Sequence, residues 1–104
     1  MSTRKKSKAV KFLEGVRGGK LTFGRLLRSI RMCEEISQVD FSLHLGISKQ
    51  YLCDIEKGRR CVSPKAVAEF AEILGYSAEQ FVQLSLQDML DRDGIHFTVQ
   101  IEAA

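Results

Sequence analysis

A single glycine, Gly46, separates two short segments that each carry the signals of a helix, and this spacing restricts the folds open to the chain. Ser37 can cap the first segment with its hydroxyl oxygen, and Gly46 can end it, because glycine adopts the left-handed conformation without a Cβ clash. After only Ile47, Ser48 can cap the second segment, which Gly58 ends. We therefore predict two short consecutive helices joined by a tight turn.

Helical signals continue on both sides of this pair. Thr22 can cap a helix that ends near Cys33, and Ser63 can cap another that has Pro64 at its first position, where the missing N–H costs nothing. Gly75 ends that helix. The apolar residues at helical spacing in these two segments are Phe23, Leu26, Leu27, Ile30, Val67, Phe70, Ala71 and Leu74. The apolar members of the first helix of the pair are Val39, Phe41, Leu43 and Leu45.

The carboxyl-terminal part of the chain carries two further signals. Ser77 followed by Gln80 matches a capping box and predicts a fifth helix. Residues 95–101 alternate apolar and polar with a period of two, which is typical of a β-strand. Since the chain offers no second strand, we expect this one to pair with the same strand of a second copy or with a partner, or else to pack on the fifth helix or fray. The residues assigned to dimerisation are Ile95, Phe97, Val99 and Ile101.

These elements predict an all-α fold of five helices with a short C-terminal β-strand. We divide the chain into a basic N-terminal extension over residues 1–21 with a short helix over 9–17, a helical domain over 22–90, and a C-terminal strand or dimerisation tail over 91–104. Residues 1–22 carry seven basic groups and one Glu, whereas residues 75–104 carry five acidic groups and one Arg. A basic half that faces a polyanion fits this distribution, and so does a solvated tail.

Composition excludes several classes of protein. The chain has 104 residues, of which 44% are hydrophobic and 28% charged, as expected for one globular domain. No window approaches the roughly 18 apolar residues of a membrane span. The basic N-terminus has no apolar segment behind it, and the three cysteines lack CxxC spacing. We therefore expect a cytoplasmic protein with reduced thiols and no membrane association.

No metal site or catalytic site is predicted. His44 and His96 lie far apart, and together with Cys33, Cys53 and Cys61 they do not reproduce a zinc-ligand spacing. No nucleophile, histidine and acid fall into a catalytic pattern, and no glycine-rich phosphate loop is present. We expect no cofactor and no enzyme activity, and we interpret Cys53 as a small neutral residue rather than a redox sensor.

Three stretches around the predicted turn form a pattern: Ser37-Gln38 where its first helix starts, Leu45-Gly46-Ile47-Ser48 across the turn, and Ile55-Glu56 with Gly58 and Arg59 after its second helix. Phe23–Arg31 and Leu74–Ser77 extend it over about residues 22–85. Together they resemble the phage-repressor-like family of Cro and Xre proteins. The resemblance implies a lambda-repressor-like helix-turn-helix domain over 22–90 that binds double-stranded DNA.

The second helix of the pair has an outward face suited to base edges. If Ile47, Leu52 and Ile55 anchor it, lysine, glutamine and aspartate side chains point away from the core. In a major groove, lysine donates to guanine, glutamine pairs with adenine N6 and N7, and aspartate accepts from cytosine N4. The resemblance assigns base reading to Ser48, Lys49, Gln50 and Asp54.

Further residues are assigned to the DNA backbone. The resemblance makes Gln38 a phosphate clamp at a helix N-terminus, and it makes Lys57, Arg59 and Arg60 the loop that follows the backbone. The hydroxyl of Tyr51 can reach a phosphate. We expect Tyr51 itself to be partly buried. In the alternative to backbone contact, the three cations are solvated surface charges.

The resemblance also implies one structural ion pair and exposes three departures from the family pattern. Arg31 and Glu56 match a pair that ties the helix before the turn to the end of the helix after it. Ser42 stands where a small alanine is usual, and Glu35 where a glycine often ends the preceding helix. The linker over 59–63 is longer than usual. These departures affect the angle between the two helices of the pair.

The resemblance implies a homodimeric repressor of its own operon, bound to a palindromic operator with half-sites about one helical turn apart. Small proteins of this kind resemble antitoxins of the HigA and HipB types, and the acidic residues within 79–102 suit a basic toxin partner. The alternative is a protein-interaction adaptor that keeps the fold without binding DNA. Lys49, Gln50 and Lys57 favour DNA, whereas Cys53 and Asp54 suit the adaptor.

Overall fold

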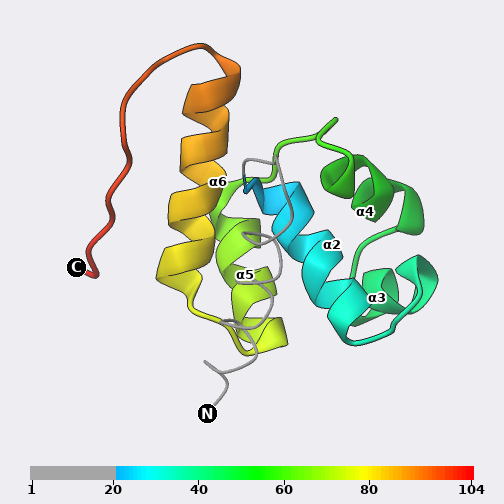
Figure 1. Ribbon diagram of the computed structural model, residues 1–104. Helices are drawn as coiled ribbons and strands as arrows, with labels where there is room; N and C mark the ends of the chain where they lie inside the picture. The colour runs from blue at the N-terminus through cyan, green and yellow to red at the C-terminus, as the bar shows by residue number, and fades with distance from the viewer. Residues whose placement is uncertain (1–20) are drawn as a thin grey trace.

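The structure, a computed structural model, describes residues 21–104 and is all-α over that range, with five helices (Figure 1). The expected helix over 9–17 and most of the basic extension lie outside the described residues. In chain order the helices are α2 (Phe23–Cys33), α3 (Gln38–Leu45), α4 (Lys49–Glu56), α5 (Pro64–Leu74) and α6 (Ala78–Arg92). None of the described helices is long and apolar enough to cross a membrane.

Each helix begins directly after the hydroxyl residue that the sequence predicts as its cap. In every case the cap side chain accepts a hydrogen bond from the backbone N–H three residues later, which satisfies one of the unpaired donors of the first turn. The caps of α2 to α6 are, in order, Thr22, Ser37, Ser48, Ser63 and Ser77. The boundaries of the helices therefore follow from local chemistry.

One hydrophobic core joins all five helices. Each contributes a side chain that is at most 1% exposed: Leu27, Phe41, Leu52, Val67 and Phe81. Phe23 packs its ring edge-on against Phe81, with ring centroids 5.6 Å apart. The edge-on contact fixes the start of α2 against the start of α6.

Only part of the apolar pattern of α3 faces this core. Phe41 and Leu45, four residues apart, are buried, whereas Val39 is 48% and Leu43 72% exposed. A helix presents one face to its neighbours, and residues two positions away from that face point outward. The alternation of apolar residues along α3 therefore leaves two of them in solvent.

The prediction of a β-strand over 95–101 is wrong. These residues have no regular secondary structure and run back along α6, on the side of the molecule away from α3 and α4 (Figure 1). The side chain of Gln87 donates to the carbonyl of Phe97 at 2.8 Å and accepts from the N–H of Val99 at 2.8 Å, while Gln83 accepts from the N–H of Ile101 at 3.2 Å. A strand needs a neighbouring strand, and here glutamine amides take its place along one edge.

Candidate nucleic-acid interface

The first turn of α4 presents polar side chains to solvent. Lys49 and Gln50 are exposed, while Leu52 and Ile55 on the opposite face are buried at 0% and 2% exposure. Ile47 in the turn and Tyr51 are half-buried and pack against the core. The core contacts therefore fix which face of α4 remains available to a ligand.

The turn between α3 and α4 takes its shape from Gly46. Its φ of 76° lies in the left-handed region, and Ile47 N–H donates back to the carbonyl of Ser42 at 3.0 Å. Ser42, which stands where the family usually has an alanine, is buried, and its hydroxyl donates to the carbonyl of Val39 at 2.8 Å. The buried hydroxyl thus has a partner within its own helix.

The end of α4 lies directly on α2, and this contact depends on Gly24. A Cβ at Gly24 would overlap the carbonyl oxygen of Ile55 and lie 3.1 Å from that of Glu56. Both contacts are with backbone, which cannot move aside as a flexible side chain would. Glycine at this position therefore sets the distance between α2 and α4.

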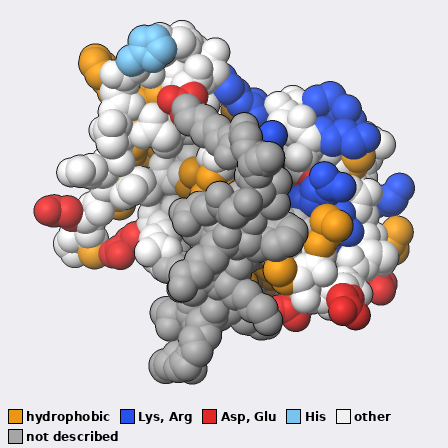
Figure 2. Space-filling view, in the orientation of Figure 1, with side chains coloured by type: hydrophobic (Ala, Val, Ile, Leu, Met, Phe, Trp, Pro, Cys, Tyr) orange, Lys and Arg blue, Asp and Glu red, His pale blue; other side chains and the backbone are white. Residues whose placement is uncertain are grey.

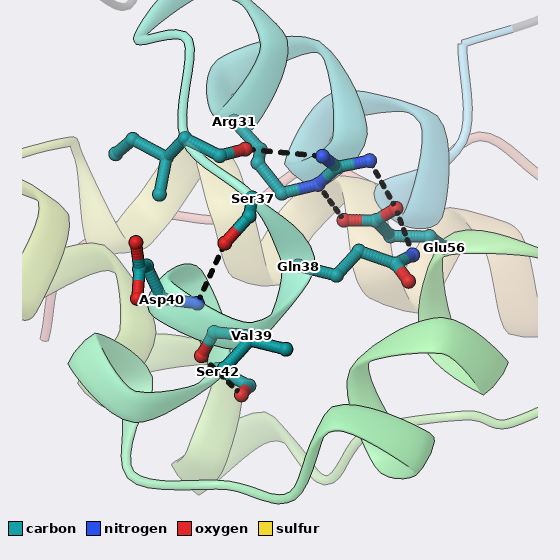
Figure 3. Close-up of polar contacts among 8 residues, drawn as sticks. Arg31, Ser37, Gln38, Val39, Asp40, Ser42 and Glu56 are labelled. Atoms are coloured by element: carbon teal, nitrogen blue, oxygen red, sulfur yellow. Dashed lines mark hydrogen bonds and ion pairs between the residues drawn. The ribbon is translucent and has the colours of Figure 1, made fainter.

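A partly buried polar cluster around Glu56 joins α3 and α4 to α2 (Figure 3). The Arg31 guanidinium donates to both carboxylate oxygens of Glu56, at 2.8 and 3.0 Å, and to the carbonyl of Ile36 at 3.1 Å. The Gln38 amide donates to the same carboxylate at 3.0 Å. The structure thus brings Arg31 and Glu56 together, and it directs the predicted phosphate clamp Gln38 toward Glu56.

A second polar network lies on the exposed side of α4. Asp54 Oδ1 accepts a hydrogen bond from Gln50 Nε2 at 3.0 Å and two from the Arg59 guanidinium, from Nε at 3.2 Å and from a terminal nitrogen at 2.9 Å. The hydrogen bond from Arg59, followed by that from Gln50, holds the pKa of the Asp54 carboxyl below its ordinary value. Sequence reasoning placed all three residues in the site without finding that they contact one another.

A cation–π contact joins the loop after α4 to the helix itself. The Arg60 guanidinium lies over the ring of Tyr51, 5.0 Å from its centroid. These two side chains, with Ser48, Gln50 and Asp54, line an open hollow on the surface of α4. A shallow surface of this kind, with hydrogen-bond donors and acceptors around it, suits contact with a macromolecule rather than enclosure of a small molecule.

The loop after α4 is also the most basic part of the described surface near the turn. Lys57, Arg59 and Arg60 are all exposed, and Lys and Arg side chains gather on the side of the molecule where α4 lies (Figure 2). Arg92, at the end of α6, donates to the sulfur of Cys61 at 3.1 Å and so adds a cation beside this loop. Sequence reasoning missed Arg92, because only the fold brings the end of α6 to residue 61.

The remaining candidates lie apart from this surface or form no site. Ile95, Phe97, Val99 and Ile101 lie along α6 rather than beside α4 (Figure 1). The three cysteines are free thiols. Over residues 21–104, no three His, Cys, Asp or Glu side chains are grouped so that they could hold a metal ion.

Two short helices across a left-handed glycine, the second with an exposed polar face and a basic loop behind it, define a helix-turn-helix module. Comparison with known families agrees. Residues 22–84 match the family model described as "Helix-turn-helix domain", and the chain belongs to that family.

The chain is also similar to a particular bacterial protein. The chain is 34% identical over 58 residues, which are 56% of this chain and 84% of the relative, to a protein named "Uncharacterized HTH-type transcriptional regulator YazB" from Bacillus subtilis (strain 168). No solved structure matches the chain.

Proposed function

We propose that the protein is a sequence-specific DNA-binding transcriptional regulator that inserts α4 into the major groove. The observation that carries this proposal is the exposed first turn of α4, where Lys49 and Gln50 stand beside a loop with three cations. A major groove about 12 Å wide admits a helix with such a face. The name of the Bacillus subtilis relative supports the same class of function.

The residues divide into two kinds of contact. Lys49 and Gln50 meet base edges and determine which sequence is bound, together with Ser48 where its capping hydroxyl allows. Lys57, Arg60 and Arg92 neutralise phosphates, which sets affinity and its dependence on salt. The base-reading residues project from a helix anchored in the core, so the domain can hold them in one geometry.

Selection of bound duplexes from a randomised library tests this proposal, followed by titration of the selected duplex at several salt concentrations. Lys49→Ala should change the preferred base at one position. Lys57→Ala removes the same charge from the loop and serves as the matched control, with weaker binding to every sequence and a salt slope smaller by about one. Binding that is independent of salt and unchanged in Lys49→Ala would instead favour the protein-interaction adaptor.

The proposal extends to a homodimer that represses its own operon at a palindromic operator. Ile95 and Phe97 in the tail are 38% and 70% exposed, and glutamine side chains hydrogen-bond only one edge of this extended segment. A second copy that pairs with the other edge would bury both side chains and satisfy the remaining backbone groups. Sedimentation equilibrium should find a dimer that Phe97→Asp dissociates, whereas Gln100→Asp, an exposed polar position of the same tail, leaves it intact.

The antitoxin role is the most specific version of this proposal. Acidic residues on α6 and the tail, among them Glu79 and Glu102, are exposed, and the start of α6 and the end of the tail lie on the side of the molecule away from α4 (Figure 1). A basic toxin bound there would leave α4 available for DNA. Co-expression with the adjacent reading frame tests this role: a stable complex that still binds the operator supports it, and failure to associate excludes it.

A further inference from the structure

The side chain of Gln50 is not a freely rotating group on the surface of α4. Its Nε2 donates to Asp54 one helical turn further on, and Asp54 is in turn held by two N–H groups of Arg59. All three donors converge on one oxygen, Oδ1. The Asp54 side chain is only 22% exposed, against 55% for Arg59.

This arrangement determines which edge of the Gln50 amide a ligand meets. A carboxamide has one carbonyl oxygen and two N–H donors. One donor is committed to Asp54, which leaves the oxygen and the second N–H for another partner. An acceptor and a donor side by side are the complement of adenine in the major groove, with its N6 amino donor and N7 acceptor.

We propose that Asp54 and Arg59 are positioning residues that hold the Gln50 amide for bidentate recognition of one adenine in each half-site. The inference rests on the proposed function, since it concerns the same surface of α4. It reassigns two residues: Asp54 acts through Gln50 rather than on a cytosine, and Arg59 acts through Asp54 rather than on a phosphate.

The charges on this surface agree with that reassignment. An uncompensated carboxylate on a DNA-facing helix repels phosphates, and Arg59 removes that cost by pairing with Asp54. The pair thus adds no net charge to the interface. Lys57 and Arg60 take no part in these hydrogen bonds and remain for the backbone.

The experiment is selection from a randomised duplex library with the full chain and four variants. We expect the unchanged protein to prefer adenine at one base pair by roughly 5- to 150-fold, the range of a good bidentate contact. Gln50→Ala should abolish this preference, and Asp54→Ala should reduce it about threefold at the same base pair and at no other. Asp54→Asn keeps an oxygen that accepts from Gln50 and should retain most of it. Glu72→Ala removes an exposed carboxylate of α5, outside the network, and should change nothing.

Each contrary outcome is distinct. An Asp54→Ala variant that keeps the Gln50-dependent preference, or that changes a different base pair, overturns the positioning role and shows that Asp54 is passive or reads a base itself. A Gln50-dependent preference for a base other than adenine also overturns the inference while the proposed function stands. A protein that selects no sequence at all overturns both.

Discussion

Glu35 is the one non-glycine residue with a left-handed φ in the described part of the chain, at 58°. It follows α2, where Ile36 N–H donates to the carbonyl of Arg31 at 3.1 Å. This pattern ends helices and is usually made by glycine, because a Cβ in this conformation costs roughly 1–2 kcal/mol. The departure from the family pattern at Glu35 therefore preserves the turn at a cost in stability.

Replacement of Glu35 by glycine should remove the cost of its left-handed conformation. We expect Glu35→Gly to raise the free energy of unfolding by about 1 kcal/mol, measured by urea denaturation. The adjacent Glu34 has an ordinary helical φ of −88°, so Glu34→Gly should lower it. A Glu35→Gly variant less stable than the unchanged protein would contradict this account of the turn.

The contacts of Asp54 predict how its carboxyl group titrates. Arg59 and Gln50 stabilise the ionised carboxylate, and Arg60 lies near enough to add to the effect, so the pKa of Asp54 lies below its ordinary value of 3.8. The resulting contribution to stability is present above pH 3.8 and is lost as pH falls through the lowered pKa. Carboxyl NMR should find Asp54 titrating below 3.8, and Arg59→Ala should raise its pKa. An unchanged pKa in Arg59→Ala would exclude the ion pair in solution.

At the scale of the elements, the position of α4 depends on its contact with α2. Gly24→Ala places a methyl group against the backbone of Ile55, so we expect α4 to shift and the protein to lose about 1–3 kcal/mol of stability. DNA affinity should fall by more than the larger unfolded fraction accounts for, because Lys49 and Gln50 move with α4.

Gly46→Ala is the matched control for this change. Its Cβ would meet nothing within 4 Å, so only the cost of a left-handed φ applies, about 1 kcal/mol. Thermal unfolding followed by circular dichroism, together with DNA titration, distinguishes the effect of the steric clash at Gly24 from that of the backbone strain at Gly46. Equal losses of DNA affinity per unit of stability lost would contradict a specific role for the α2–α4 contact.

The position of α4 also depends on the ion pair between Arg31 and Glu56. Arg31→Ala leaves the Glu56 carboxylate, whose side chain is 2% exposed, with only the neutral Gln38 amide, so stability should fall by about 3–5 kcal/mol. Replacement of both partners by apolar residues, Arg31→Met with Glu56→Leu, should cost much less. Denaturant unfolding compares the two, and a double variant as unstable as the single one would show that the pair itself stabilises the fold.

The elements also show what a sequence can predict. Hydroxyl caps, Pro64 and the terminal glycines are local signals. The five helices begin where the caps place them, and α3 and α5 end at Gly46 and Gly75 as predicted. The contacts of Gln38 and of Asp54 depend on residues 18 and 5 positions away that only the folded chain brings near. The alternation over 95–101 reports which side chains share a face, but it contains no information on whether a pairing strand exists.

At the scale of the whole molecule, acidic and basic side chains of the described residues are unevenly distributed over the surface. Basic side chains gather over α4, whereas α6 and the tail on the other side show acidic ones (Figure 2). Asp88 of α6 accepts a hydrogen bond from the N–H of Phe23 at 2.8 Å, so α6 also contacts the start of α2. Helix α2 in turn packs against α4. In the proposed function, a partner at the tail and DNA at α4 would therefore contact different sides of one core.

The central claim is that α4 and the loop after it form the surface that binds DNA. Titration of isotope-labelled protein with its selected duplex, followed by backbone amide NMR, tests this claim directly. We predict that the largest shifts fall on Lys49, Gln50 and Arg60, with the tail over 95–101 changing little at constant oligomeric state. Shifts confined to α6 and the tail, with the amides of α4 unchanged, would contradict it.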